Sequence, residues 1–235
     1  MSRLQRLKSA ADVCGSLGVI LVAGILIWKQ FQPSSPIAKE PPIHDVQNVR
    51  LAATDVKNAI GSGRTALVEF ADYECPFCGR HARDIYPLVK EQLIDAGRLR
   101  YVFMNYPLTE IHPQAFKASE AAECAADQDR FWSMHKLLFA SATAMAHADL
   151  VAHADALGLD SGRFRKCLAG EKADKVLADM QRGRQLGVNG TPAFFFGRVA
   201  PDGSIELTKR IDGAVSYDAL AKVVESISEG LRAGD

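Results

Sequence analysis

TALVEFADYECPFCGRHAR, the stretch from Thr65 to Arg83, indicates both the fold and the chemistry of this chain. It begins with an apolar run that is typical of a buried strand, continues through a short acidic loop and reaches Cys75-Pro76-Phe77-Cys78, where the pattern predicts the first turn of a helix. Two thiols separated by two residues on such a turn can close a disulfide with little backbone movement. The stretch therefore predicts a disulfide that can form and open again.

The two sulfurs of this pair are expected to have different roles. At the start of a helix, unpaired amide N–H groups and the positive end of the helix dipole favour a thiolate, and Cys75 is the sulfur with access to them. Its pKa should fall from about 8.5 to between roughly 3.5 and 7.5, which makes it a nucleophile and a good leaving group. Cys78 lies one turn deeper, and we expect it to be the shielded sulfur that resolves a mixed disulfide.

Two other interpretations of the pair are weaker. Half of a zinc site would need two more Cys or His ligands at comparable spacing, but the remaining cysteines, Cys14, Cys124 and Cys167, stand alone, so no metal is expected. A purely structural disulfide across so short a loop would remove little chain entropy from the unfolded state and would stabilise little. No cofactor is expected either.

The composition sets the outer bounds. The 235 residues, 48% of them hydrophobic, suffice for one good-sized domain plus an appendage. The 28 basic and 28 acidic residues cancel, and the part expected to fold carries no basic block. We therefore expect no nucleic-acid partner.

An uncharged apolar run from Val13 to Trp28 lies near the N-terminus. It approaches the length of about 20 residues that crosses a bilayer. An uncleaved anchor is favoured over a cleaved signal peptide, because the residues that follow Trp28 form a poor cleavage site and Phe31 is typical of the membrane interface. Three basic residues precede the run and should keep the N-terminus in the cytoplasm; they are Arg3, Arg6 and Lys8. We therefore expect a single membrane span, with everything after it on the other side of the membrane.

Export changes the meaning of the cysteine count, because thiols in an oxidising compartment tend to be paired. Cys14 lies within the apolar run and is interpreted as a small apolar side chain. When Cys75 and Cys78 form one pair, Cys124 and Cys167 remain, and we predict a structural disulfide between them that links two helices. The alternative is that both are buried free cysteines.

The chain is predicted to contain four regions. They are a cytoplasmic tip and membrane anchor (1–31), a proline- and serine-rich linker (32–42), an α/β domain made from two segments (43–112 and 187–235), and a helical domain inserted between those segments (113–186). The insertion is indicated by a change of period, because alanine-rich helical patterns replace the strand-like runs. Its five helices are expected at 115–126, 130–140, 148–157, 163–168 and 171–186, around a core of Phe116, Phe131, Trp132, Leu137, Leu138 and Phe139.

In the α/β part the hydrophobic pattern predicts four strands and a final helix. The strands are expected at 65–71, 99–106, 193–196 and 205–211, and the helix at 217–231. The order strand, helix, strand predicts that the first two strands are parallel. The turn at Pro201-Asp202-Gly203 predicts that the last two are antiparallel to each other. The helix that begins at the two cysteines should end before Gly97 and bend near Asp84, because Pro87 in its middle lacks a backbone N–H. A short helix is expected within 49–60.

The pattern resembles the DsbA-like thiol-disulfide oxidoreductases of the thioredoxin superfamily. The resemblance extends from Thr65 to about Leu231 and depends on two signatures, Cys75-Pro76-Phe77-Cys78 and Gly190-Thr191-Pro192. It implies an α/β, thioredoxin-like fold with an inserted helical domain, here preceded by a single N-terminal transmembrane helix. It also implies that a cis peptide bond joins Thr191 to Pro192 beside the active disulfide; the alternative is an ordinary trans proline at the start of an edge strand.

The resemblance further implies roles for individual residues. Pro76, Phe77, Thr191 and Pro192 would contact an extended substrate segment, with the backbone of Thr191 pairing with it as an added strand. Glu69 stands six residues before Cys75, where the family has a buried acid, and would shuttle the proton of Cys78; the alternative is that Glu69 faces solvent. Phe77 departs from the most oxidising members of the family, which have a histidine in that place.

The histidines outside these motifs are given plainer interpretations. His81 follows Cys78 by three residues, and a protonated imidazole there would lower the pKa of a thiol, but a surface position on the helix is favoured. His112 is expected at the start of a helix. Trp132 and His135 are expected to pack within the helical domain.

Together with the resemblance, these observations favour a membrane-tethered oxidoreductase that inserts disulfides into exported proteins. We expect a single-pass protein of the bacterial inner membrane whose catalytic domain lies on the periplasmic side. A membrane partner would then reoxidise it, such as a quinone-linked oxidase. One alternative is a reductase or isomerase that a thiol reductase keeps reduced. Another is a holdase or assembly factor without enzymatic activity that binds unfolded segments around Pro192 while its disulfide stays closed.

Overall fold

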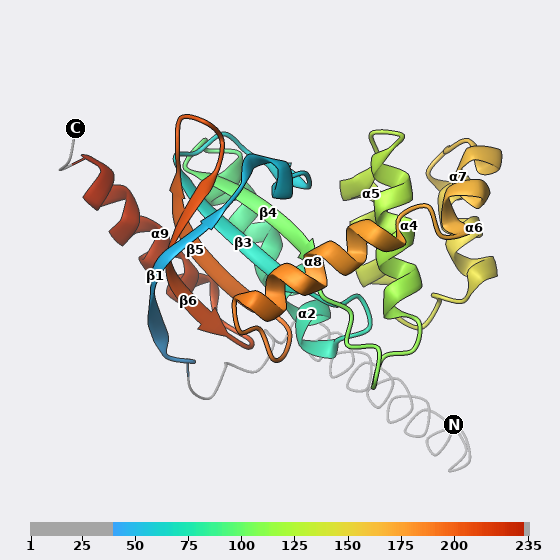
Figure 1. Cartoon of the computed structure of the whole chain (residues 1–235), viewed down its shortest axis with the longest axis horizontal. Helices are drawn as coiled ribbons and strands as arrows, with labels where there is room; N and C mark the ends of the chain where they lie inside the picture. Colours follow the sequence, from blue (N-terminus) through green and yellow to red (C-terminus); the bar gives the residue numbers. More distant parts are fainter. Residues whose placement is uncertain (1–39, 233–235) are drawn as a thin grey trace, which may run out of the picture. The chain divides into compact units, whose positions relative to one another are not determined.

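A six-stranded sheet organises residues 40–232, which are the residues that this computed structural model describes (Figure 1). Its strands are β1 (Ile43–Leu51), β2 (Ala59–Ile60), β3 (Thr65–Ala71), β4 (Leu99–Asn105), β5 (Ala193–Val199) and β6 (Ile205–Asp212), in the order β1-β6-β5-β3-β4-β2. The predicted parallel pair is confirmed, since β3 and β4 run parallel with Thr65 opposite Leu99. The neighbours β5 and β6 are antiparallel, as predicted.

The expected membrane anchor, Cys14 within it and most of the linker lie outside the described residues. Within residues 40–232, no helix combines the length and the apolar character that a membrane span requires.

The two faces of the sheet are covered by different helices. Alternate residues of a strand point to opposite faces, and β3 is buried on both. Leu67 packs with residues of the helix that follows the two cysteines and of α9 (Tyr217–Arg232), whereas Val68 belongs to the cluster on the other face. There, α8 (Ala173–Gln185) runs across the strands (Figure 1), and a Cβ on its Gly183 would come within 2.5 Å of the Tyr106 ring. The last helix of the insertion therefore also covers the sheet.

The helix that begins at the cysteines is continuous but not regular. It consists of α2 (Pro76–Arg80), the π-helical turn η2 (His81–Ile85), α3 (Tyr86–Val89) and the π-helical turn η3 (Lys90–Ile94). Pro87 follows the first wide turn, where a missing N–H is accommodated by a local change in the hydrogen-bond pattern. Gly97, with φ of 70°, lies just beyond the helix, as predicted.

The prediction of a short helix within 49–60 is wrong. This region contains the end of β1, a single 3₁₀ turn (η1, Ala53–Asp55) and the short strand β2. β1 pairs with β6, more than 150 residues away, with Leu51 opposite Ile205. The helical spacing in this region was weak, and pairing with the distant strand β6 determines its structure instead.

The inserted helices agree closely with the predicted ranges. They are α4 (Ala115–Ala126), α5 (Phe131–Ala140), α6 (His147–Ala156), α7 (Ser161–Leu168) and α8. Of the expected core residues, Phe131, Leu138 and Phe139 are buried, but Phe116, Trp132 and Leu137 are only half-buried. Small residues of α4, such as Ala118 and Ala122, fill much of the core instead. Trp132 packs against the clusters of both the insertion and the sheet, so it connects the two.

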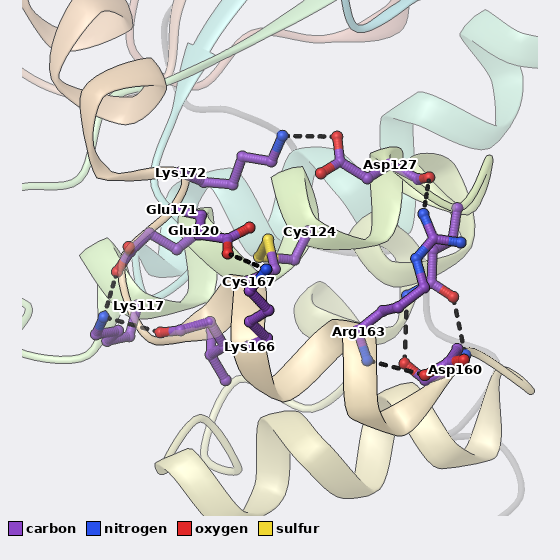
Figure 2. The surroundings of a disulfide bond; sticks show 12 residues. Lys117, Glu120, Cys124, Asp127, Asp160, Arg163, Lys166, Cys167, Glu171 and Lys172 are labelled. Carbon is purple, nitrogen blue, oxygen red and sulfur yellow. Dashed lines mark hydrogen bonds and ion pairs between the residues drawn. A yellow bond between two sulfur atoms is a disulfide. The ribbon is translucent and has the colours of Figure 1, made fainter.

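A disulfide between Cys124 on α4 and Cys167 on α7 links two helices of the insertion, with 5.7 Å between the Cα atoms (Figure 2). Figure 2 shows charged side chains around it, including the ion pairs of Lys172 with Asp127 and of Lys117 with Glu120, each 2.6 Å. Both cysteines are buried. The bridge therefore belongs to the core of the insertion.

Candidate active site at the start of a helix

The two remaining described cysteines are free thiols at the start of α2. Cys75 has extended backbone (φ −68°, ψ 122°) and immediately precedes the helix, whose first residue is Pro76, a proline-tolerant position. Its carbonyl accepts a hydrogen bond of 2.9 Å from the N–H of Gly79. Cys75 is 5% exposed and Cys78 is fully buried one turn below it. The local geometry thus places one sulfur at the mouth of the helix and the other beneath it.

The surroundings of Cys75 favour its thiolate. Its pKa is lowered to about 6, chiefly by a hydrogen bond from the Cys78 thiol, against the opposing effect of burial. The backbone N–H groups of Phe77 and Cys78 lower the pKa further. Cys75 is therefore largely ionised at neutral pH.

Cys78 has the opposite character. Burial raises the pKa of its thiol well above the usual range, and the hydrogen bond to Cys75 and the charges of Cys75 and Glu69 raise it further. It remains a thiol at neutral pH unless a base removes its proton. The pair is thus divided into an ionised sulfur at the start of the helix and a neutral, fully buried one.

Alkylation of the mildly reduced native protein with iodoacetamide is expected to follow this division. Cys75 should react with a midpoint near pH 6, where its thiolate forms, while Cys78 should react only after unfolding. Peptide mass spectrometry assigns the modified sulfurs, and a Cys75→Ser chain should lose the low-pH reaction. A midpoint near pH 8.5 to 9 at Cys75 would contradict the geometry described here.

Glu69 on β3 is a buried acid, only 2% exposed, on the side of the sheet that carries Cys78. Burial raises the pKa of its carboxyl to about 8, a hydrogen bond from the Tyr101 hydroxyl lowers it, and the charge of Cys75 raises it. Its Oε1 atom has no hydrogen-bond partner among the described residues. Near neutral pH such a carboxyl can both accept and return a proton.

The Thr191–Pro192 peptide bond is cis and lies against Cys75. The Cys75 thiol donates a hydrogen bond of 3.3 Å to the carbonyl of Thr191, and the carbonyl of Pro192 accepts one of 2.8 Å from the N–H of Gly213. A cavity of about 530 Å³ opens beside this turn, and Phe77, which is 51% exposed, lines it together with Thr191. Pro76 is exposed at the start of α2, whereas Pro192 is buried beneath the turn.

The expectation that His81 lies on the surface is wrong. It is 3% exposed, its Nε2 lies 3.3 Å from the Tyr101 hydroxyl, and its ring centroid lies 4.7 Å from that of Phe194. Helical periodicity placed it on the same side as Cys78, and that side faces the sheet. Burial lowers the pKa of His81 to about 3, so it is neutral and cannot supply the positive charge that a thiolate would need.

The other histidines have structural roles. His135 is buried among aromatic rings, as expected, and its Nδ1 lies 3.3 Å from the hydroxyl of Tyr73. His112 precedes α4, and its Nδ1 lies 2.8 Å from Oδ2 of Asp72. Asp72 is fully buried and also accepts the N–H groups of Glu74 and Leu108, so it fixes the loop between β3 and the cysteines.

Sequence reasoning missed Tyr101 and Asp72. The sequence placed Tyr101 in a strand parallel to that of Glu69, but only the register of β3 and β4 in the structure places both side chains on the same face. Asp72 gave no signal beyond its place in an acidic loop. Among residues 40–232, no group of three or more His, Cys, Asp or Glu side chains is arranged to hold a metal ion.

The chain is similar in sequence to known proteins. A family model described as thioredoxin matches residues 57–225. A segment of 130 residues, 55% of this chain, is 45% identical to the Na(+)/H(+) antiporter NhaA 3 of Salinispora tropica, but it spans only 19% of that protein.

Solved structures share the fold. The chain is similar to alpha-DsbA1 of Wolbachia pipientis, with a TM-score of 0.64 and 22% identity over 76% of this chain and 94% of that one. It is also similar to oxidised BdbD of Bacillus subtilis, with a TM-score of 0.61 and 21% identity over 78% of this chain and 98% of the other. At these identities, the likeness concerns the arrangement of the chain in space.

Proposed function

This chain belongs to the thioredoxin family and has the fold of the DsbA-like thiol-disulfide oxidoreductases, and on that premise we propose that it oxidises thiols of exported proteins. The observation that carries the proposal is the division of the dithiol. The pKa of Cys75 is lowered to about 6, whereas that of Cys78 is raised. A stabilised thiolate on Cys75 favours the reduced form of the pair, and a pair whose reduced form is stable is a good oxidant.

The first step begins with the Cys75–Cys78 disulfide. A substrate thiolate attacks the sulfur of Cys75 and forms a mixed disulfide, and the bond to Cys78 breaks, so that Cys78 leaves as a thiolate. The carboxyl of Glu69, when protonated, supplies the proton that converts this thiolate to a thiol.

The second step releases the oxidised substrate. A second substrate thiolate attacks the substrate sulfur of the mixed disulfide, a substrate disulfide forms, and Cys75 leaves as a thiolate. Its lowered pKa makes it a good leaving group. The substrate has then lost two electrons and two protons, the enzyme pair is reduced, and an external oxidant must regenerate it.

The cavity beside the cis proline is the proposed place for the substrate segment that flanks the reacting cysteine. Phe77 offers it an exposed ring, and the backbone around Thr191 offers strand-like pairing. The apolar run at 13–28 and the basic residues before it support a membrane-tethered domain on the periplasmic side of a bacterial inner membrane. The proposed reoxidant is a membrane partner, such as a quinone-linked oxidase.

Refolding of a reduced secreted protein tests the proposal. The oxidised full-length chain should restore activity to a substrate whose activity depends on disulfides, and Cys75→Ser should reduce the yield to that of the uncatalysed reaction. Equilibration with glutathione buffers gives the direction of electron flow, and a potential above about −200 mV is expected for an oxidant. A value below about −300 mV would identify a bridge that does not exchange and would overturn the proposal.

A further inference from the structure

Beneath the dithiol, three buried polar side chains from three different elements form a chain of hydrogen bonds. The Tyr101 hydroxyl on β4 donates to Oε2 of Glu69 on β3 and lies 3.3 Å from Nε2 of His81 on η2. Tyr101 is fully buried, and the other two are 2% and 3% exposed. Because all three side chains are shielded from bulk solvent, their mutual contacts strongly influence their protonation.

The backbone explains why these residues meet. In the parallel register Tyr101 lies opposite Leu67 and Phe103 lies opposite Glu69, so Tyr101 and Glu69 are diagonal neighbours on one face of the sheet. His81 follows Cys78 by three residues on the helix that covers this face. The chain of contacts thus joins the buried acid to the helix that carries the buried thiol.

The number of available hydrogens fixes the state of His81. A tyrosine hydroxyl has one hydrogen, and here it is donated to Glu69. The contact with His81 can then be a hydrogen bond only if Nε2 carries a hydrogen and donates it to the Tyr101 oxygen. Nδ1 of His81 has no partner among the described residues, and burial keeps the ring neutral.

We propose that His81 and Tyr101 are positioning residues that keep Glu69 able to ionise, and that His81 acts as a neutral hydrogen-bond donor rather than as a proton carrier. This inference deepens the function proposed above and rests on it. Burial alone would leave Glu69 protonated, and the Tyr101 hydroxyl stabilises its ionised form. Donation from His81 strengthens the donor character of that hydroxyl.

The step that depends on this arrangement is the proton exchange with Cys78. In the proposed step the Cys78 thiol loses its proton and the Glu69 carboxylate gains it, and the reverse transfer returns it. Several other titratable groups face Glu69 or lie around it in the same buried region, and a test must follow each of them. They are Cys75, just before α2, Cys78 on α2, Tyr86 on α3, Tyr73 in the loop after β3, and His135 on α5.

Tyr101→Phe tests the hydroxyl with little change in packing, because the ring contacts with Tyr86 and Trp132 remain available. Carbon-13 NMR of glutamate carboxyl groups in the reduced full-length chain follows the titration of Glu69, which Glu69→Gln identifies by the loss of its signal. The midpoint is expected to rise by about one pH unit or more, because a hydrogen bond to the ionised form is lost. At pH 7 a one-unit rise reduces the ionised fraction about tenfold.

Two substitutions of His81 separate a donor from a proton carrier. Glutamine places an amide N–H close to the position of Nε2 and cannot be protonated, so His81→Gln should keep the Glu69 midpoint close to that of the native chain. His81→Leu removes the donor and should raise the midpoint in the same direction as Tyr101→Phe. If His81→Gln raises the Glu69 midpoint as much as His81→Leu does, the donor role is wrong. If His81→Leu does not fold, His81→Gln still tests the donor role by comparison with the native chain.

The rate at which Cys78 closes the disulfide is a second measurement, because a purely structural role of Tyr101 would not change the pH dependence of this rate. Its pH profile should shift upward in Tyr101→Phe, and this shift should vanish in a Glu69→Gln background, since the effect acts through the carboxyl. An unchanged Glu69 midpoint in Tyr101→Phe overturns the inference. Carboxyl titration needs no substrate, so failure of the proposed oxidase activity would be recognised separately.

Discussion

A chain in which Cys78 is replaced by serine is expected to remain joined to its substrate through Cys75. Replacement of Cys78 removes the hydrogen bond that chiefly lowers the pKa of Cys75, but the backbone N–H groups at the start of α2 still favour the thiolate, so Cys75 still attacks a substrate disulfide. In the native chain the buried Cys78 sulfur then attacks the mixed disulfide from within the same molecule. Reactive groups held in place in this way correspond to effective concentrations of about 10⁵ M or more, so removal of Cys78 should lengthen the life of the mixed disulfide by several orders of magnitude.

Non-reducing electrophoresis after an acid quench measures this species, and mass spectrometry locates the bond. Cys75→Ser is the matched control and should give no adduct, although it retains the other thiol. Because Cys78 is fully buried, its own adduct should not form in that control. An adduct on Cys78, or equally short-lived adducts in the native and Cys78→Ser chains, would contradict the assignment of the two sulfurs.

The parts of the fold that could be predicted are those that depend on local pattern. The bounds of β3 and α4 match the predicted ranges, because β3 is a clear apolar run, α4 has strong helical spacing, and glycine or aspartate marks the ends. The reactive pair was likewise predictable, since its chemistry depends on two residues in a single turn. In both cases the information lies within about ten residues of chain.

The parts that could not be predicted depend on contacts between distant segments. β1 becomes a strand because β6 pairs with it, and nothing near residue 43 indicates that partner. His81 could be placed on a helix but not on its buried face, since that required knowing which side covers the sheet. Tyr101 acquires its importance from Glu69, 32 residues earlier in the chain, through a hydrogen bond that only the register of two strands creates.

Removal of the Cys124–Cys167 disulfide is expected to lower the free energy of unfolding by about 2 to 4 kcal/mol. The two residues are separated by 43 positions, and closing a loop of that size in the unfolded chain corresponds to about 4 kcal/mol in the loop-entropy description. The ion pairs around the bridge cannot replace it, because Lys172 and Asp127 are partly exposed and such pairs contribute about 1 kcal/mol or less.

Urea unfolding of the double variant Cys124→Ala/Cys167→Ala measures this loss. Alkylation of Cys78 provides a second, independent measure of whether the insertion has loosened. The insertion contributes Phe131 and Phe139 to a cluster that also contains Cys75 and Cys78, so a loosened insertion should raise the accessibility of Cys78 to alkylation. Because the bridge joins only helices of the insertion, that part can unfold first, and two probes should then give different midpoints. A loss below about 0.5 kcal/mol with coincident midpoints would mean that packing of α4 against α7 holds the insertion without the bridge.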